Sequence, residues 1–283
     1  MRTTNFAIPA KLWLILVFCL AVTGTAHGQI LDAIKDALSG KAKQSKSGKS
    51  SETPEPNTAH EINPGPKNEF FTSNVSVSSY DFEKQARTES CFSKASLAMR
   101  SDWTDPRTDE RQTAYTDSEG YFTALNKGEQ RWEKTKLLAM EGMDMVGPST
   151  MLSAYKLPVG PYWEAAKKYK EKGLKIGAFL HVGFAFIYKP EHFRTEHYTE
   201  KKVNCNGTER CTKFEINEDG YEGSYIMFDY LDKLAEINVV VKDNPQFGSG
   251  KGNIEYFYDR GCNFTIPAAV EMKMPGQDLF NMD

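Results

Sequence analysis

The stretch Tyr225-Ile-Met-Phe-Asp-Tyr-Leu-Asp-Lys-Leu-Ala-Glu-Ile237 predicts two neighbouring β-strands joined by a short turn. The strands are expected at 220–229 and 233–241, with Tyr230-Leu-Asp232 as the turn. Further strands on short connections are expected at 199–204, 212–216, 253–259 and 262–266. Because antiparallel strands can be joined by short turns and parallel strands cannot, this half of the chain predicts an antiparallel meander.

The segment immediately before the meander alternates between apolar and other residues. Seven apolar side chains occupy its even positions: Ile176, Ala178, Leu180, Val182, Phe184, Phe186 and Tyr188. This period of two predicts a strand that is buried on one side. At about 3.3 Å per residue such a strand would be roughly 43 Å long, so we expect it to bend, with Gly177 and Gly183 as the places for the bend.

Helical patterns come earlier in the chain, at 83–100, 127–146 and 161–172. The last is the clearest, because Pro161 suits the first helical position and apolar residues recur at helical spacing until Gly173. Helices that precede a run of strands indicate the α+β class. We therefore predict a curved antiparallel sheet preceded by helices and packed on them.

The first 68 residues read as an export signal and a linker. Residues 1–28 combine an early positive charge, an apolar run from Leu12 to Val22 and a cleavage pattern at Ala26-His27-Gly28, which are the marks of a signal peptide. Residues 29–68 contain a short amphipathic leader and then a stretch of Ser, Lys, Gly, Glu and Pro that predicts a flexible linker. A single domain is expected over 69–283. The chain is thus predicted to be exported to the periplasm or the exterior and to be soluble after signal cleavage.

Four cysteines follow the signal peptide, and an even number in an exported chain favours two disulfides. Three pairings are open. We favour Cys205 with Cys211 across a hairpin turned by Asn206-Gly207, and Cys91 with Cys262. A zinc site is the alternative, but no Cys-x-x-Cys pair is present.

Charge and motifs narrow the classes of function. The net charge is −3, from 35 basic and 38 acidic residues, which speaks against a nucleic-acid partner. His192 and His197 lie in a segment rich in Glu, but their spacing of five does not bring them to one metal ion on a strand or a helix. His181 is expected to be a structural residue. We predict no resident metal or cofactor and no catalytic residue.

The second half of the chain, about 174–270, resembles the lipoprotein-carrier (LolA-like) half-barrel group and related exported bacterial proteins of unknown function. The long apolar segment, the hairpin of 225–237, Gly252-Asn-Ile-Glu-Tyr-Phe-Tyr-Asp259 and Phe264-Thr-Ile-Pro-Ala268 carry the resemblance. The resemblance implies an open curved sheet that wraps over helices, with an apolar space between them that holds acyl chains.

These observations lead to a binding protein as the expected function, and they favour a non-enzyme over an enzyme. The ligand would be a lipid or another hydrophobic molecule, with a pocket lined by Leu180, Val182, Phe184 and Phe186 from the predicted strand and by Met140 and Met143 from the predicted helix. Two alternatives remain open. One is a structural or interaction module with a fully packed core and a cell-envelope partner. The other is a metal-assisted hydrolase that uses His181, His192 or His197.

Overall fold

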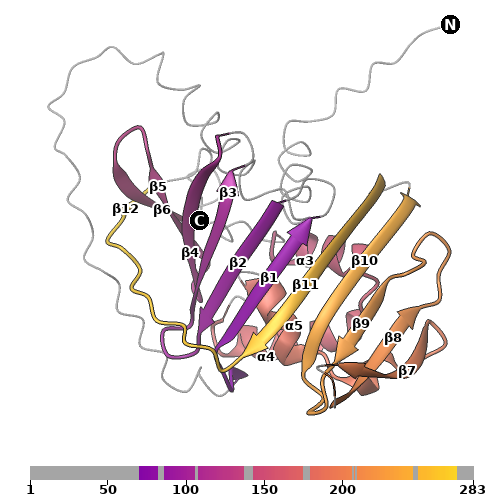
Figure 1. The fold of residues 1–283 in the computed structure, drawn as a ribbon. Helices are drawn as coiled ribbons and strands as arrows, with labels where there is room; N and C mark the ends of the chain where they lie inside the picture. The colour runs from indigo at the N-terminus through magenta and orange to yellow at the C-terminus, as the bar shows by residue number, and fades with distance from the viewer. Residues whose placement is uncertain are drawn as a thin grey trace, which may run out of the picture.

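The computed structural model describes residues 70–81, 86–105, 108–136, 143–174, 179–205, 207, 209–244 and 248–272. The predicted signal peptide and the predicted leader and linker lie outside these residues. Within them the chain forms one twelve-stranded sheet with helices on one of its faces (Figure 1). No helix in the described part of the chain is long and apolar enough to cross a bilayer.

The sheet consists of two meanders that meet in its middle. The first contains β1 (Val75–Asp81), β2 (Ala86–Ser93), β3 (Ala98–Asp105), β4 (Glu110–Asp117), β5 (Tyr121–Asn126) and β6 (Arg131–Lys136). The second contains β7 (Tyr198–Cys205), β8 (Glu209–Ile216), β9 (Tyr225–Phe228), β10 (Leu234–Asn244) and β11 (Gly248–Tyr258). β11 pairs antiparallel with β1 and joins the meanders, while the short β12 (Val270–Glu271) pairs parallel with β6 at the edge.

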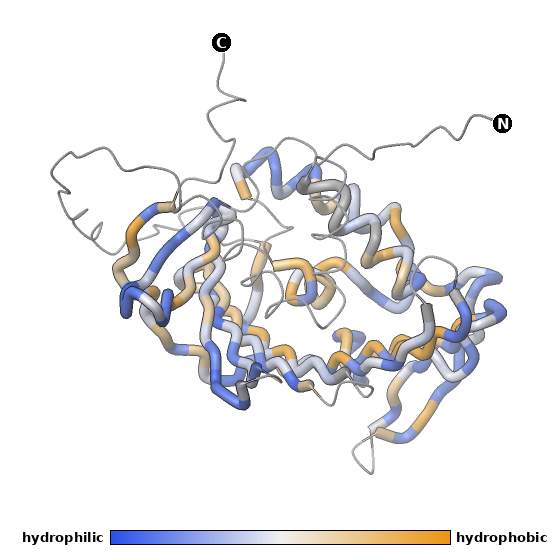
Figure 2. Tube along the Cα trace, turned by 90° about the horizontal axis from the view of Figure 1, so that it is seen from above, coloured by the Kyte–Doolittle hydropathy of each residue, from blue (hydrophilic) through white to orange (hydrophobic). Residues whose placement is uncertain are grey.

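The helices lie in the chain between the two meanders. They are α3 (Met143–Ala154), α4 (Val159–Glu171) and α5 (Leu180–Ile187), followed by a 3-10 turn, η3 (Pro190–Phe193). Seen from above, the curved sheet lies on one side of them (Figure 2). The predicted α+β class with a curved, mainly antiparallel sheet is confirmed. The predicted order is wrong in one respect, since one half of the strands comes before the helices.

The predicted helix at 83–100 is wrong, because its described residues form β2 and the start of β3. Leu97, between the two strands, has φ 47°, a left-handed conformation that a right-handed helix does not contain. The predicted helix at 127–146 is replaced by β6 and the beginning of α3, with 137–142 outside the described residues. The helix at 161–172 is confirmed as α4.

The predicted strand at 176–188 is also wrong, because residues 180–187 form helix α5. Apolar side chains at the odd positions, Phe179, Ala185 and Ile187, make the segment apolar on all sides rather than on one. A helix that is apolar all round is stable when it is covered on every side. α5 meets this condition in part, since it lies against β1 of the sheet and against α4 while Leu180 and Phe186 stay partly accessible.

Residues 262–266, expected to be a strand, instead belong to a segment without regular structure that leads from β11 to β12. Cys262 in this segment is disulfide-bonded to Cys91 of β2. Cys91 faces away from the helices, because its neighbour Phe92 packs into the core beneath them. Further on, the ring of Phe264 lies 5.7 Å from that of Tyr115 on β4. The segment therefore crosses the outer face of the first meander, and we call residues 259–269 the strap.

The second disulfide, Cys205–Cys211, closes the hairpin of β7 and β8. Gly207 in this turn has φ 83°, which glycine adopts without strain. Both disulfides have the predicted pairing.

Removal of the disulfide between the strap and the sheet should destabilise the protein more than removal of the hairpin disulfide. The first joins residues 171 apart and the second residues 6 apart, and a longer closed loop restricts the unfolded chain more. We expect Cys91→Ala with Cys262→Ala to lower the free energy of unfolding by up to about 5 kcal/mol, and Cys205→Ala with Cys211→Ala by about 2 kcal/mol. Urea unfolding measures the free energy of unfolding of both double variants. An equal or larger decrease in the hairpin variant would contradict the expected order.

Candidate functional site

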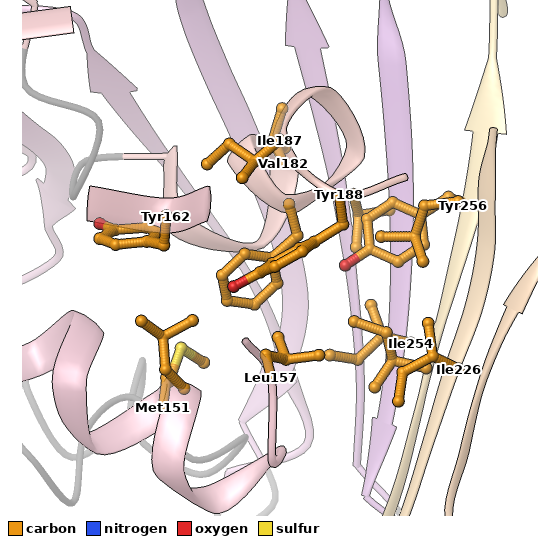
Figure 3. Packing of buried hydrophobic residues seen from close by; sticks show 14 of the residues in the cluster. Met151, Leu157, Tyr162, Val182, Ile187, Tyr188, Ile226, Ile254 and Tyr256 are labelled. Atoms are coloured by element: carbon orange, nitrogen blue, oxygen red, sulfur yellow. The ribbon is translucent and has the colours of Figure 1, made fainter. Parts of the chain in front are cut away.

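The candidate site is the apolar layer between the sheet and the helices. We use this name for the continuous cluster of buried side chains that joins β1, β2 and β8–β11 to the helical side (Figure 3). From the strands it includes Val75, Val77, Phe92, Phe214, Ile226, Phe228, Ile237, Ile254 and Tyr256. From the helical side it includes Met151, Leu157, Tyr162, Val182, Phe184, Ile187 and Tyr188. Strands of both meanders and the helices thus share one packed apolar cluster.

The four predicted pocket residues of 176–188 all belong to this layer, although they come from a helix. Val182 and Phe184 are fully buried, while Leu180 and Phe186 are partly buried at its margin. On a helix, residues four apart share a face, so Leu180 lies near Phe184 and Val182 lies near Phe186. The four side chains therefore point in two directions, and the predicted single lining face is wrong in that respect.

Aromatic rings fill the part of the layer that adjoins β1 and β2. The ring of Phe71 lies 5.1 Å from that of Phe186 and 4.7 Å from that of Phe92. Phe179, at the start of α5, lies 5.2 Å from Phe92 in an edge-to-face arrangement. Such ring pairs stabilise the packing beyond the area that they bury. Phe186 is thus held by rings from outside its own helix.

The remaining predicted pocket residues are two methionines. Met140 lies outside the described residues, and Met143 is the first residue of α3, with its side chain also outside the description. Their place in a ligand pocket stays a prediction. Met151, on the last turns of α3, is buried in the layer.

Several tyrosine hydroxyls reach into or border the apolar layer. Tyr188 donates to the carbonyl oxygen of Pro158 at 2.9 Å, and Tyr258 donates to that of Leu234 at 2.8 Å. Burial raises the pKa of Tyr188, Tyr256 and Tyr258, and it raises the pKa of Tyr169 to about 12. These hydroxyls therefore remain protonated at neutral pH. The sequence predicts burial for Tyr188 only, and it gives no signal for the partner that a tyrosine hydroxyl finds.

The histidines singled out in the sequence are dispersed. His181 on α5 lies 3.5 Å from the hydroxyl of Tyr155, measured from its Nε2. His192 accepts a hydrogen bond at Nδ1 from the backbone N–H of Lys189. In the described ranges, no group of three or more His, Cys, Asp and Glu side chains is arranged to hold a metal ion.

A polar hollow lies on the sheet face away from the helices. It has a volume of about 530 Å³ and is lined by Tyr80, Arg87, Asn253 and Glu255. Arg87 approaches Glu255 to 3.9 Å. Nearby, Glu236 accepts a hydrogen bond from Tyr225 at 2.8 Å, while its burial raises its pKa. Asn253 of the hollow donates a hydrogen bond to Glu236. No sequence pattern predicted these residues as a site.

Comparison with known proteins gives distant structural likenesses. No family model matches the chain, and no curated protein matches it. An uncharacterised conserved protein from Thermus thermophilus is similar at 6% identity and a TM-score of 0.33, over 73% of this chain and 94% of that one. A LolA superfamily protein from Nitrosomonas europaea is similar at 7% identity and a TM-score of 0.21, over 65% of this chain and 82% of that one. At these TM-scores the likenesses carry no argument about function.

Alkaline pH should destabilise the protein through its buried tyrosines. An unfolded tyrosine ionises near pH 10, whereas burial raises the pKa of Tyr169 to about 12 in the folded state. The folded state thus binds more protons between these values, and stability falls as the pH rises from about 10 to 12. For Tyr169 the two-unit shift corresponds to about 2.7 kcal/mol. The wild type should lose free energy of unfolding between pH 10 and 12, as measured by urea unfolding. We expect Tyr169→Phe to make this loss smaller by about 2.7 kcal/mol. If the wild type and the variant lose the same free energy of unfolding over this pH range, Tyr169 does not contribute to the alkaline destabilisation.

Proposed function

We propose that this chain is an exported, non-enzymatic protein that binds a lipid or another hydrophobic molecule in the apolar layer between its curved sheet and its helices. Binding would consist of the transfer of an apolar chain from water into this layer, which gains about 0.8 kcal/mol for each buried methylene. The proposal needs no covalent step.

The observation that carries the proposal is the position of α5 within the layer. Six of its eight residues are apolar, and it lies between the sheet and α4. Leu180 and Phe186 are partly accessible at the margin, while Val182 and Phe184 are buried behind them. An apolar chain that entered beside α5 would therefore meet apolar side chains from the surface to the interior.

Two further features support an exported carrier. The two disulfides fit an oxidising compartment. The sheet is open, with β7 and β12 at its two edges, so the helical side is not closed by a barrel of strands in the described residues. A periplasmic or extracellular site of action follows from the predicted signal peptide.

A second candidate is the interaction module of the cell envelope, and one observation favours it. The turn between β9 and β10 exposes two large apolar side chains, Tyr230 and Leu231, each with 57% of its surface accessible. Exposed neighbouring apolar side chains are typical of contacts with another protein. Under this alternative the apolar layer is a packed core and binds no ligand.

The substitution Leu180→Asp separates the two candidates. A carboxylate at the margin of the layer would lose its water when an acyl chain covers it, so we expect the affinity for a hydrophobic probe to fall at least tenfold. Displacement of N-phenyl-1-naphthylamine by palmitoyl lipids measures this affinity in the purified mature protein, and native mass spectrometry detects lipid that remains bound after purification.

Leu231→Asp is the matched control, because it makes the same change at the exposed turn and should leave probe binding unchanged. Circular dichroism and the urea midpoint establish that both variants fold. A folded Leu180→Asp protein with unchanged affinity would show that the layer does not receive the probe. Loss of binding in Leu231→Asp would instead favour the exposed turn as the site.

A further inference from the structure

Tyr256 introduces a hydrogen-bond donor into the middle of the apolar layer. It lies on β11 opposite Val77 of β1, and only 5% of its surface is accessible. Its side chain extends from the sheet toward the helices, among Tyr188, Ile254 and Ile226 (Figure 3). Within the described residues, its hydroxyl oxygen is fully buried and has no hydrogen-bond partner.

Two neighbouring buried tyrosines have hydrogen-bond partners for their hydroxyls, so the fold does not require an unpartnered hydroxyl in this layer. Tyr258, two residues further along the same strand, donates its hydroxyl to the carbonyl oxygen of Leu234. Tyr188, which follows α5, donates to the carbonyl oxygen of Pro158. Buried hydroxyls in folded proteins generally have such partners, because a donor without one loses its hydrogen bonds to water and gains nothing in return.

A ligand with an acceptor atom would give the Tyr256 hydroxyl the hydrogen bond that it lacks. The surroundings of Tyr256 favour an uncharged acceptor, since no Lys, Arg or His is among the buried residues of the described chain. An ionised carboxylate would enter the layer without a counter-ion and would incur the cost of burying a charge. A carbonyl oxygen of an ester or an amide requires one donor and no counter-ion, and the buried hydroxyl of Tyr256 offers one donor.

We propose that the Tyr256 hydroxyl donates a hydrogen bond to the carbonyl oxygen of an ester-linked or amide-linked acyl lipid bound in the apolar layer. This inference rests on the proposed function and narrows its ligand class from any hydrophobic molecule to acyl esters and amides. Tyr256 acts in it as a specificity determinant, while the apolar side chains around it hold the acyl chain.

The test compares methyl palmitate with heptadecane, a hydrocarbon of similar length without a carbonyl group. Affinities of both are measured by displacement of N-phenyl-1-naphthylamine from the wild type and from Tyr256→Phe. The variant keeps the aromatic ring and removes the donor, so it should bind methyl palmitate about fivefold more weakly and heptadecane with unchanged affinity. The comparison of variants cancels the different solubilities of the two probes.

Tyr258→Phe is the matched control, because Tyr258 lies on the same strand and face as Tyr256 and its hydroxyl already has a partner in Leu234. Tyr258→Phe should lower the urea midpoint and keep the wild-type ratio of the affinities for methyl palmitate and heptadecane. Tyr256→Phe should change this ratio and keep or raise the urea midpoint. An unchanged ratio in Tyr256→Phe would overturn this inference and leave the proposed function standing, provided that the wild type binds both probes. A wild type that binds neither probe would overturn both.

Discussion

The antiparallel pairing of β1 with β11 is the constraint on which the rest of the structure depends. It joins seven residue pairs, from Val75 with Tyr258 to Asp81 with Gly252, and it makes one sheet out of two meanders that are separated in the chain by the helices. The helices cover this junction, since α5 packs against β1 and the apolar layer spans both meanders. Without the pairing, α5 would have no continuous apolar surface beneath it. The strap adds a covalent link across the other face, through Cys91 and Cys262.

Local patterns in the sequence predicted the second meander well and the first one poorly. The hairpin of 225–237 and the strands around it have short connections, and their partners are near in sequence, so β8–β11 follow from the pattern. β1–β6 also pair mostly with their neighbours in sequence, and only β1 pairs with the distant β11. They were missed because buried positions hold small or polar residues such as Ser101 and Ala114, which give no apolar alternation. The α+β class was nevertheless predictable, because it requires only that strands on short turns and helices both occur. The error at 176–188 has a different cause: an apolar run with apolar residues at odd and even positions fits a buried helix and a buried strand equally well.

A role in a ligand pocket stays a prediction for Leu180, Val182, Phe184 and Phe186. Their contact with the apolar layer follows from the sequence, because hydrophobicity drives burial. Their distribution over two helix faces required the structure. Tyr256 was beyond prediction for another reason, since the sequence shows a tyrosine in a strand but not whether its hydroxyl finds a partner. The same holds for the hollow on the outer face, whose residues come from three separate strands.

An acyl chain that enters the apolar layer beside α5 would contact the sheet beneath it. The methylenes of bound methyl palmitate should then give nuclear Overhauser effects with methyl groups of the labelled protein. We expect these effects at Leu180, Val182 and Ile187 on α5 and at Ile254 on β11, which all belong to the layer. Effects confined to the exposed Val159 and Leu231, with the ligand shown to be bound, would contradict this binding mode.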